Sequence, residues 1–336
     1  MPPYSGYLNK FLTMIDFISA TIFGCKGTII FSHLQLENQS SKYNREIYAI
    51  KGCEDMKIVI LNNTDGIRLK GSVPYFFQGN NFTFDRAKFV QTIDYIKQIT
   101  NLDFWQADID EFEYGVIMEV PTKPKEYIIH HSSKPNEGLT KEEKGRDKGR
   151  FRWWSDKNVS LKMYDAGYNI KTKQSESRKQ TLRQIGWEDA KKYIKFEVHY
   201  KKPHIVLNKG RNMKLWHLAN SDWEMVLKKD LLNQYQRLVP SKDIKLPNDK
   251  KDFRTLNVYA YALTESAINA GCSLEEVKKM LYNAVNSAGD ILSKSDKDAR
   301  KHEIKKIQSL IEVQTTSRWD LTEKIAQAVG LNSIPN

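Results

Sequence analysis

Cysteine is scarce in this sequence of 336 residues, which contains three, Cys25, Cys53 and Cys272. They are widely spaced and include no pair at the short separation typical of zinc sites or of a disulfide framework. We therefore expect three reduced cysteines that serve in packing.

Long apolar runs are also missing. No segment approaches the roughly 18 uninterrupted apolar residues of a membrane-spanning helix, and Met1–Thr13 lacks the apolar stretch and cleavage site of a signal peptide. We expect a soluble, cytoplasmic protein with no membrane partner. The chain has no Gly-rich Lys-Ser/Thr phosphate loop, no G-x-S-x-G elbow and no H-E-x-x-H pair, which argues against an independent nucleotide hydrolase, an α/β-hydrolase and a zincin.

The charge is strongly one-sided, because the net charge is +12 at pH 7. The segment from Lys134 to Lys214 contains 22 Lys and Arg but 10 Asp and Glu, so this quarter of the chain carries the whole excess of positive charge. Such a run is often only a solvated face. Here, however, the cations alternate with aromatic residues such as Trp153, Trp154 and Tyr168, a combination that holds phosphates and stacks bases. This segment predicts nucleic-acid binding.

Short β-branched runs separated by turn residues fill the first half of the chain and predict an antiparallel sheet. Asp85 is expected to cap a helix, and His130–Arg150 is expected to be an exposed loop. From about Trp216 the pattern becomes helical, with a capping box at Ser273 and Glu276. We predict an α+β fold, with an extension over 1–13, a sheet domain over 14–210 and a helical domain over 211–336. The strands are expected at Ile15–Phe23, Thr28–Leu36, Arg45–Ile50, Lys57–Leu61, Gly66–Val73, Ile109–Val120, Val159–Ala166 and Ile194–Lys201.

Polar residues share faces of the predicted strands because side chains alternate across the pleat. Tyr164 lies on the same face as Lys162, so its phenol could serve as a nucleophile beside a cation. Glu197 and His199 flank Val198 and point the same way, and Glu113 would join them if the strands are neighbours. Carboxylates and an imidazole in that arrangement suit Mg²⁺ or Mn²⁺. From spacing alone, an ordinary strand tyrosine and solvated carboxylates remain open alternatives.

The order of several short motifs resembles the phage and plasmid replication proteins typified by the filamentous-phage gene-two initiator. The resemblance covers about Met14 to Lys202, and its specificity lies in the order of the motifs. These are Met14-Ile15-Asp16, Leu69-Lys70-Gly71-Ser72, Gln78-Gly79-Asn80-Asn81, Glu113-Tyr114-Gly115-Val116, Lys162-Met163-Tyr164-Asp165 and Lys195-Phe196-Glu197.

The resemblance implies a nicking domain similar to the HUH endonucleases, in which Tyr164 cleaves one strand of origin DNA and keeps the 5′ end as a phosphotyrosine. It implies Glu113 and Glu197 as metal or active-site acids and a divalent cation, Mg²⁺ or Mn²⁺, as cofactor. Host helicase and polymerase are the implied protein partners. Together with the basic segment, it predicts DNA contacts at Lys70, Ser72, Asn80, Arg150, Arg152, Lys171 and Lys173.

Three alternatives stay open at this stage. Tyr168 is a second candidate nucleophile, provided that the strand of Tyr164 continues through Gly167. A regulator that binds DNA without cleaving it would keep the charge pattern and lack the chemistry. A relaxase or transposase would use the same tyrosine chemistry for recombination in place of replication.

Overall fold

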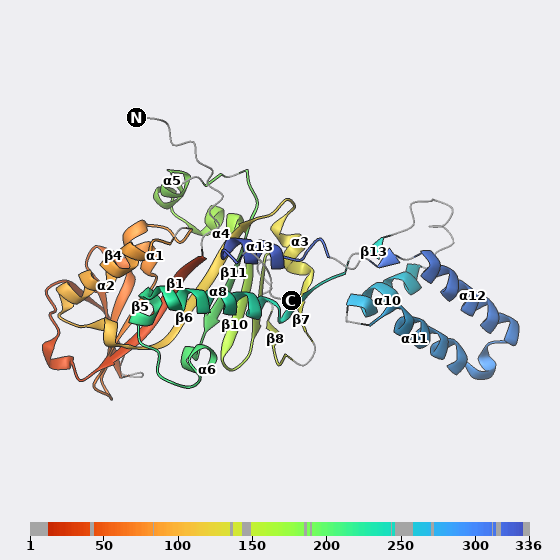
Figure 1. The fold of residues 1–336 in the computed structure, drawn as a ribbon, viewed down its shortest axis with the longest axis horizontal. Helices are drawn as coiled ribbons and strands as arrows, with labels where there is room; N and C mark the ends of the chain where they lie inside the picture. The colour runs from red at the N-terminus through yellow and green to blue at the C-terminus, as the bar shows by residue number, and fades with distance from the viewer. Residues whose placement is uncertain are drawn as a thin grey trace. The chain divides into compact units, whose positions relative to one another are not determined.

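The computed structural model describes residues 13–40, 44–82, 84–134, 137–142, 149–184, 187–188, 190–242, 244–245, 258–269, 272–310, 312–313 and 317–331 (Figure 1). These residues divide into two compact units. One unit extends to Val239 and also takes in the C-terminal segment from Leu321, and the other is Pro240–Asp320.

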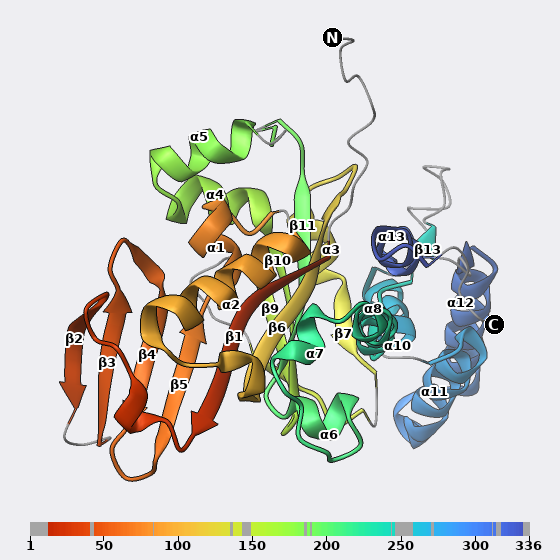
Figure 2. The ribbon, with the colours of Figure 1, turned by 60° about the vertical axis from the view of Figure 1, so that its left-hand side comes forward.

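A ten-stranded antiparallel sheet forms the larger unit. Its strand order is β2-β3-β4-β5-β1-β6-β11-β10-β9-β8, so β6 is bordered by β1, the first strand in sequence, and by β11, the last of the ten (Figure 2). The strands are β1 (Thr13–Phe23), β2 (Leu34–Ser40), β3 (Arg45–Ile50), β4 (Cys53–Leu61), β5 (Gly66–Gly71), β6 (Asp108–Glu119), β8 (Thr140–Glu142), β9 (Phe151–Ser155), β10 (Val159–Asp165) and β11 (Tyr193–Tyr200).

Helices bury the apolar face of the sheet. On β6 the alternate residues Phe112, Tyr114, Val116 and Met118 are all buried, and α8 and α13 pack there. The opposite face of the same strands carries the polar residues. The helices of this unit are α1 (Val73–Gln78), α2 (Arg86–Thr100), α3 (Pro124–Ile129), α4 (Ala166–Lys173), α5 (Glu176–Gln184), α6 (Pro203–Leu207), α7 (Trp216–Ala219), α8 (Ser221–Tyr235) and α13 (Thr322–Ala328), and a small sheet pairs β7 (His131–Ser133) with β12 (Leu238–Pro240).

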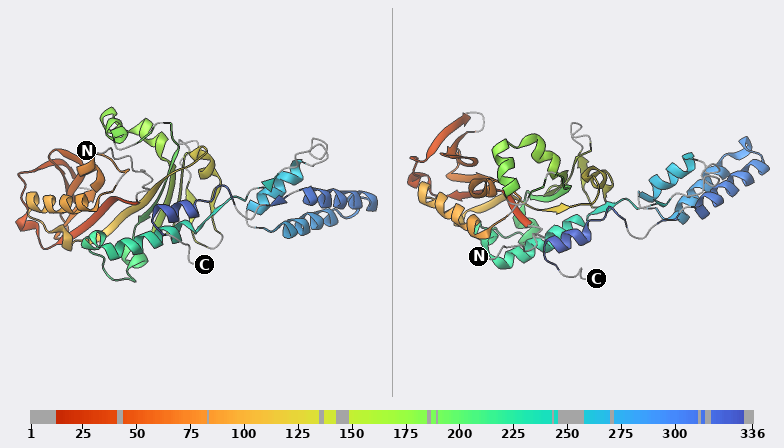
Figure 3. Two further views of the ribbon diagram at one scale, coloured as in Figure 1. Left: turned by 45° about the horizontal axis from the view of Figure 1, so that its top comes forward. Right: turned by 90° about the horizontal axis from the view of Figure 1, so that it is seen from above.

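The smaller unit is helical. Its helices α10, α11 and α12 lie side by side in both views of Figure 3. The predicted capping box is confirmed, because Ser273 accepts from the backbone of Glu276 and the Glu276 carboxylate accepts from Ser273. Its elements are α10 (Val258–Asn269), α11 (Leu274–Ser287), α12 (Lys294–Leu310), β13 (Ile244–Lys245) and β14 (Glu312–Val313).

Most predicted strands are found close to their expected bounds, and Asp85 caps α2 by accepting from Lys88 N at 3.2 Å. The strand predicted over Thr28–Leu36 was wrong in its first part, because Lys26–Thr28 is a 3₁₀ turn and β2 begins at Leu34. The expected loop His130–Arg150 contains β7 and β8. Within it, 135–136 and 143–148 lie outside the described residues.

The expected change of domain near residue 210 falls between α6 and α7, inside the larger unit. The residues of α8 belong to the larger unit because this helix is amphipathic and buries Leu227, Leu231 and Tyr235. It also contacts β6 and β11. A separate functional role for the helical part stays a prediction, and the extension 1–13 lies almost wholly outside the described residues. None of the helices that the structure describes has the length and apolar content needed to cross a membrane.

Candidate active site

The candidate site is built on the polar face of β10 and β11. In the register of this antiparallel pair, Lys162 lies opposite Glu197 and Tyr164 lies opposite Lys195. Directly opposed residues share a face of the sheet. The predicted placement of Tyr164 beside Lys162 is therefore accompanied by a second cation, Lys195, on the neighbouring strand.

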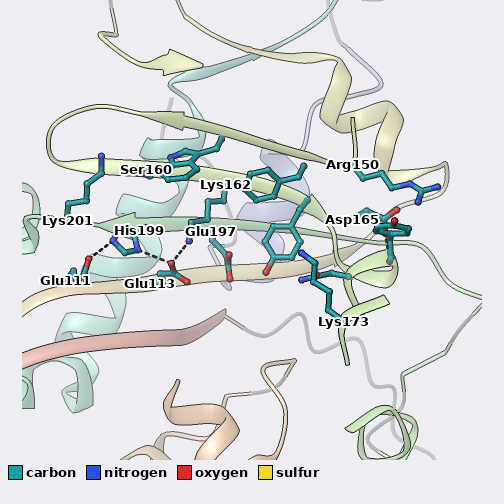
Figure 4. Close-up of a pocket in the computed structure, with 15 residues that line it drawn as sticks. Glu111, Glu113, Arg150, Ser160, Lys162, Asp165, Lys173, Glu197, His199 and Lys201 are labelled. Carbon is teal, nitrogen blue, oxygen red and sulfur yellow. Dashed lines mark hydrogen bonds and ion pairs between the residues drawn. The ribbon is translucent and has the colours of Figure 1, made fainter. Parts of the chain in front are cut away.

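Strand β6 adds carboxylates from the other side of β11. His199 lies opposite Glu113, so the two strands are neighbours, which was the condition for Glu113 to join Glu197 and His199. Glu111, two residues before Glu113, also lies on the polar face. The imidazole of His199 bridges the two acids, with Nδ1 at 2.9 Å from Glu113 and Nε2 at 2.9 Å from Glu111 (Figure 4).

Asp16 reaches the same site through an irregularity in β1. The pairing register of β1 with β6 shifts between Ile15 and Ile18, where β1 contains one residue more than the segment of β6 that it pairs with. A bulge of this kind re-aims side chains. Ile15 and Ile18 are both buried, and Asp16 between them is buried as well.

The carboxylates of Asp16, Glu113 and Glu197 form a group that could hold a metal ion. One oxygen from each lies within 4.8 Å of the others. The Asp16 carboxylate is positioned by Ser72, whose hydroxyl donates to it at 3.1 Å, and by Asn81, whose amide donates at 2.8 Å. Three oxygen donors supported by hydrogen bonds fit the ligand preference of Mg²⁺ or Mn²⁺.

Lys195 supplies the positive charge among these acids. Its side chain is buried, with its Nζ 2.7 Å from Asp16 and 2.5 Å from Glu197. Burial alone lowers the pKa of this ammonium, but the charges of Asp16 and Glu197 outweigh it and hold the pKa well above its ordinary value. The ammonium therefore stays protonated.

The pKa of Glu197 is shifted upward. Burial raises its pKa to about 7, although the charge of Lys195 opposes this shift. Its Oε1 lies 2.5 Å from the Nζ of Lys195, so the two groups form an ion pair. An oxygen in this position retains a lone pair for a cation or a proton.

Tyr164 is half-buried beside this group. The Nζ of Lys195 lies 5.9 Å from the centre of the phenol ring. Burial raises the pKa of the Tyr164 phenol well above its ordinary value, the charge of Glu197 raises it further, and Lys195 lowers it. The phenol therefore needs additional positive charge nearby before it can ionise at neutral pH.

Glu113 and His199 form a charged network with Lys162. Burial raises the pKa of Glu113, but His199 and Lys162 outweigh it and bring the pKa below its ordinary value. Burial lowers the pKa of His199, while the hydrogen bonds to Glu111 and Glu113 raise it above its ordinary value. A protonated His199 donates from both nitrogens, and the group suited to a metal does not include it.

One pocket of about 530 Å³ brings most of the predicted site together. A second cavity, of about 340 Å³, shares Glu113, Tyr164, Asn169 and Glu197 with it and extends toward Asp16. Tyr164 thus stands where two cavities meet. The predicted residues that line the first pocket are Glu113, Arg150, Lys162, Tyr164, Lys173, Glu197 and His199.

Of the other predicted DNA contacts, Ser72 lines the second cavity and Lys171 lies on α4, while Lys70, Asn80 and Arg152 line neither cavity. Lys70 is exposed on β5, with its Nζ 3.6 Å from Glu111. Asn80 is buried, and its amide bonds to the backbone of Gln78 and Phe82 at 3.0 Å, which makes it part of a turn. Arg152 donates to backbone carbonyls of residues 129 and 131 at 2.8 and 2.7 Å.

Tyr168 does not continue the strand of Tyr164. Strand β10 ends at Asp165, whose carboxylate caps α4 by accepting from the backbone of Tyr168 at 2.9 Å. Tyr168 is therefore a helical residue, and its ring lies beneath the guanidinium of Arg150 at 4.0 Å.

Sequence reasoning missed Asp16 and Lys195 as members of the site. The signal for Asp16 was the run Met14-Ile15-Asp16-Phe17-Ile18, which breaks the alternation of a regular strand and so indicates a bulge. The signal for Lys195 was its position two residues before Glu197, on the same strand face.

Comparisons with known proteins add little. No family model matches the chain, and no curated protein matches its sequence. One solved structure that matches is a rolling circle replication initiator protein from Geobacillus stearothermophilus, at 9% identity and a TM-score of 0.39, over 73% of this chain and 91% of that one. A likeness this weak does not establish a common fold or function. The resemblance to the gene-two initiators stays a prediction.

Proposed function

We propose that this protein is a replication initiator that nicks one strand of DNA through Tyr164 and remains joined to the 5′ end. The observation that carries the proposal is the meeting of Tyr164 with the carboxylates of Asp16, Glu113 and Glu197 in one pair of adjoining cavities. Transfer of a phosphodiester to a phenol requires a nucleophile, compensation of phosphate charge and a bound strand.

The three carboxylates are the proposed ligands of one Mg²⁺ or Mn²⁺. When bound, such an ion would polarise the scissile phosphate and favour ionisation of a nearby phenol. Lys195 contributes a fixed charge beside Tyr164 whether or not an ion is bound.

In the proposed reaction the Tyr164 Oη forms a bond to phosphorus while the bond from phosphorus to the 3′ oxygen breaks. The phenolic proton is lost to solvent as the phenol ionises beside the cations of the site. The departing oxygen takes up a proton and becomes the 3′-hydroxyl that can prime synthesis. Reversal of the same step rejoins the strand.

Covalent capture tests the proposal. Wild-type protein, Mn²⁺ and single-stranded DNA covering its replicon should give an adduct that survives denaturation and that peptide mass spectrometry assigns to Tyr164. Mixing the adduct with a strand that ends in a 3′-hydroxyl should release the protein and rejoin the DNA. Binding without any adduct would favour a DNA-binding regulator.

A further inference from the structure

A cationic groove lies beyond the pocket of Tyr164. It is a cavity of about 530 Å³ bounded by α4, α5 and the segment that leads into β11. Among the described residues that line it, six are Lys or Arg and two are Asp or Glu. The cations are Arg150, Lys171, Lys179, Arg183, Lys191 and Lys192.

The cationic groove adjoins the catalytic pocket. Arg150, Asp165 and Tyr168 line both cavities. The first turn of α4, capped by Asp165, therefore forms the wall between them.

The wall carries an aromatic surface of the kind that stacks on a base. Tyr168 is 37% exposed, and the Arg150 guanidinium 4.0 Å from its ring centre holds the ring in place. Trp187 and Tyr193, with ring centres 4.3 Å apart, line the same cavity. Stacking on an aromatic ring stabilises a bound single-stranded base by about 1–3 kcal/mol.

The cations of the groove differ in their partners within the part of the chain that the structure describes. Lys179 pairs with Glu176 at 2.8 Å, and Lys191 pairs with Glu188 at 3.1 Å. Lys192 instead donates to the backbone carbonyl of residue 121 at 3.0 Å, which leaves its charge available to an anion. Lys171 is exposed on α4.

We infer that the cationic groove binds the single-stranded segment of DNA next to the scissile phosphate, with a base stacked on Tyr168 and phosphates at Lys171 and Lys192. This inference rests on the proposed function for the identity of the adjoining pocket. A single strand fits better than a duplex, because stacking on Tyr168 requires an unpaired base face.

The test measures binding of the full chain to an oligothymidylate of about 20 nucleotides, long enough to cover a site of this class, as a function of salt. The double variant Lys171→Gln and Lys192→Gln is compared with Lys88→Gln and Lys229→Gln, which removes equal charge from exposed positions on α2 and α8. Loss of two phosphate contacts should reduce the slope of log affinity against log salt by about 1.4 and weaken binding about tenfold at moderate salt. The control pair should leave both values unchanged.

Photocrosslinking gives the second measurement. The same oligonucleotide carrying 5-iodouracil should crosslink to the peptide that contains Tyr168, and Tyr168→Leu should remove that crosslink. Unchanged salt slopes in the groove variant, or crosslinks confined to other peptides, would overturn the inference even if Tyr164 forms its adduct. A reduced slope and a Tyr168 crosslink without any Tyr164 adduct would uphold the groove and reject the nicking function.

Discussion

Gly115 of β6 lies directly opposite Glu197 of β11, and the absence of a side chain at Gly115 makes room for the Glu197 carboxylate. A Cβ added at Gly115 would lie 2.7 Å from the Glu197 Cγ and 2.7 Å from the backbone oxygen of Phe196. Real Cβ atoms do not approach other atoms this closely. The position of Glu197 within the carboxylate group therefore depends on a glycine across the strand pair.

Gly115→Ala should displace Glu197 and weaken the binding of Mn²⁺ by at least about tenfold, with a loss of about 1–3 kcal/mol of stability from overpacking. Isothermal titration calorimetry and thermal denaturation measure the two effects. Gly27→Ala is the matched control, because nothing lies within 4 Å of a Cβ at that position. Equal Mn²⁺ affinity in Gly115→Ala and wild type would contradict the assignment of Glu197 as a ligand.

Glu113→Gln should reduce Mn²⁺ affinity by at least about tenfold, because one of three carboxylate ligands is lost. Glu119→Gln is the control on the same strand, since Glu119 is exposed and pairs with Lys191 at 3.4 Å. Electron paramagnetic resonance of added Mn²⁺ distinguishes free from bound ion. The metal group would have to be placed elsewhere if both variants bound Mn²⁺ equally well.

Lys195→Met should destabilise the metal-free protein by about 3–5 kcal/mol, because it leaves Asp16 and Glu197 buried without their cation. A divalent ion should replace that charge, so Mn²⁺ should raise the melting temperature of this variant more than that of wild type. Lys191→Met, at an exposed position, should behave as wild type. A melting temperature of Lys195→Met that does not respond to Mn²⁺ would show that no ion binds between these acids.

Asp156 connects the turn before β10 with the end of α8. Its carboxylate accepts from the backbone of Asn158 at 2.6 Å and Val159 at 2.8 Å, and from Arg237 at 2.7 Å. Burial alone raises the pKa of Asp156, but these hydrogen bonds and the charge of Arg237 lower it below its ordinary value. A lowered pKa in the folded state adds stability above the unfolded pKa of about 3.9, and this stability is lost as the pH falls through the folded value.

Asp156→Asn should therefore cost about 1 kcal/mol at neutral pH, a value reduced by the partial exposure of the pair. The difference from wild type should shrink as the pH falls below about 4. Urea denaturation across this pH range measures it, with Asp65→Asn at an exposed turn as the control. A difference that does not change with pH would show that the Asp156 charge adds no stability.

Much of the sheet could be predicted from the sequence because its strands have one buried face. The alternating apolar residues of β6 and β11 predict which side chains lie on the polar face. They therefore place Glu113, Glu197 and His199 on the same face of the sheet. Strand β9 was not predicted, because Phe151–Ser155 is a short segment in which Arg152 separates aromatic residues and no apolar alternation is visible.

The rest of the site depends on contacts between distant segments. Asp16 enters through a bulge, and its partner Lys195 lies 179 residues away in sequence. No local pattern predicts such a pairing. The same is true of α8, whose apolar residues indicate a buried face but do not reveal that β6 and β11 cover it.

The most direct test of the central claim compares wild type with Tyr164→Phe in the presence of Mn²⁺ and single-stranded DNA from the intergenic region of the replicon. The substitution removes only the phenolic oxygen, so binding and melting temperature should be retained. We predict a denaturation-resistant adduct on Tyr164 in wild type and none in the variant. An adduct that persists in Tyr164→Phe would contradict the assignment of Tyr164 as the nucleophile.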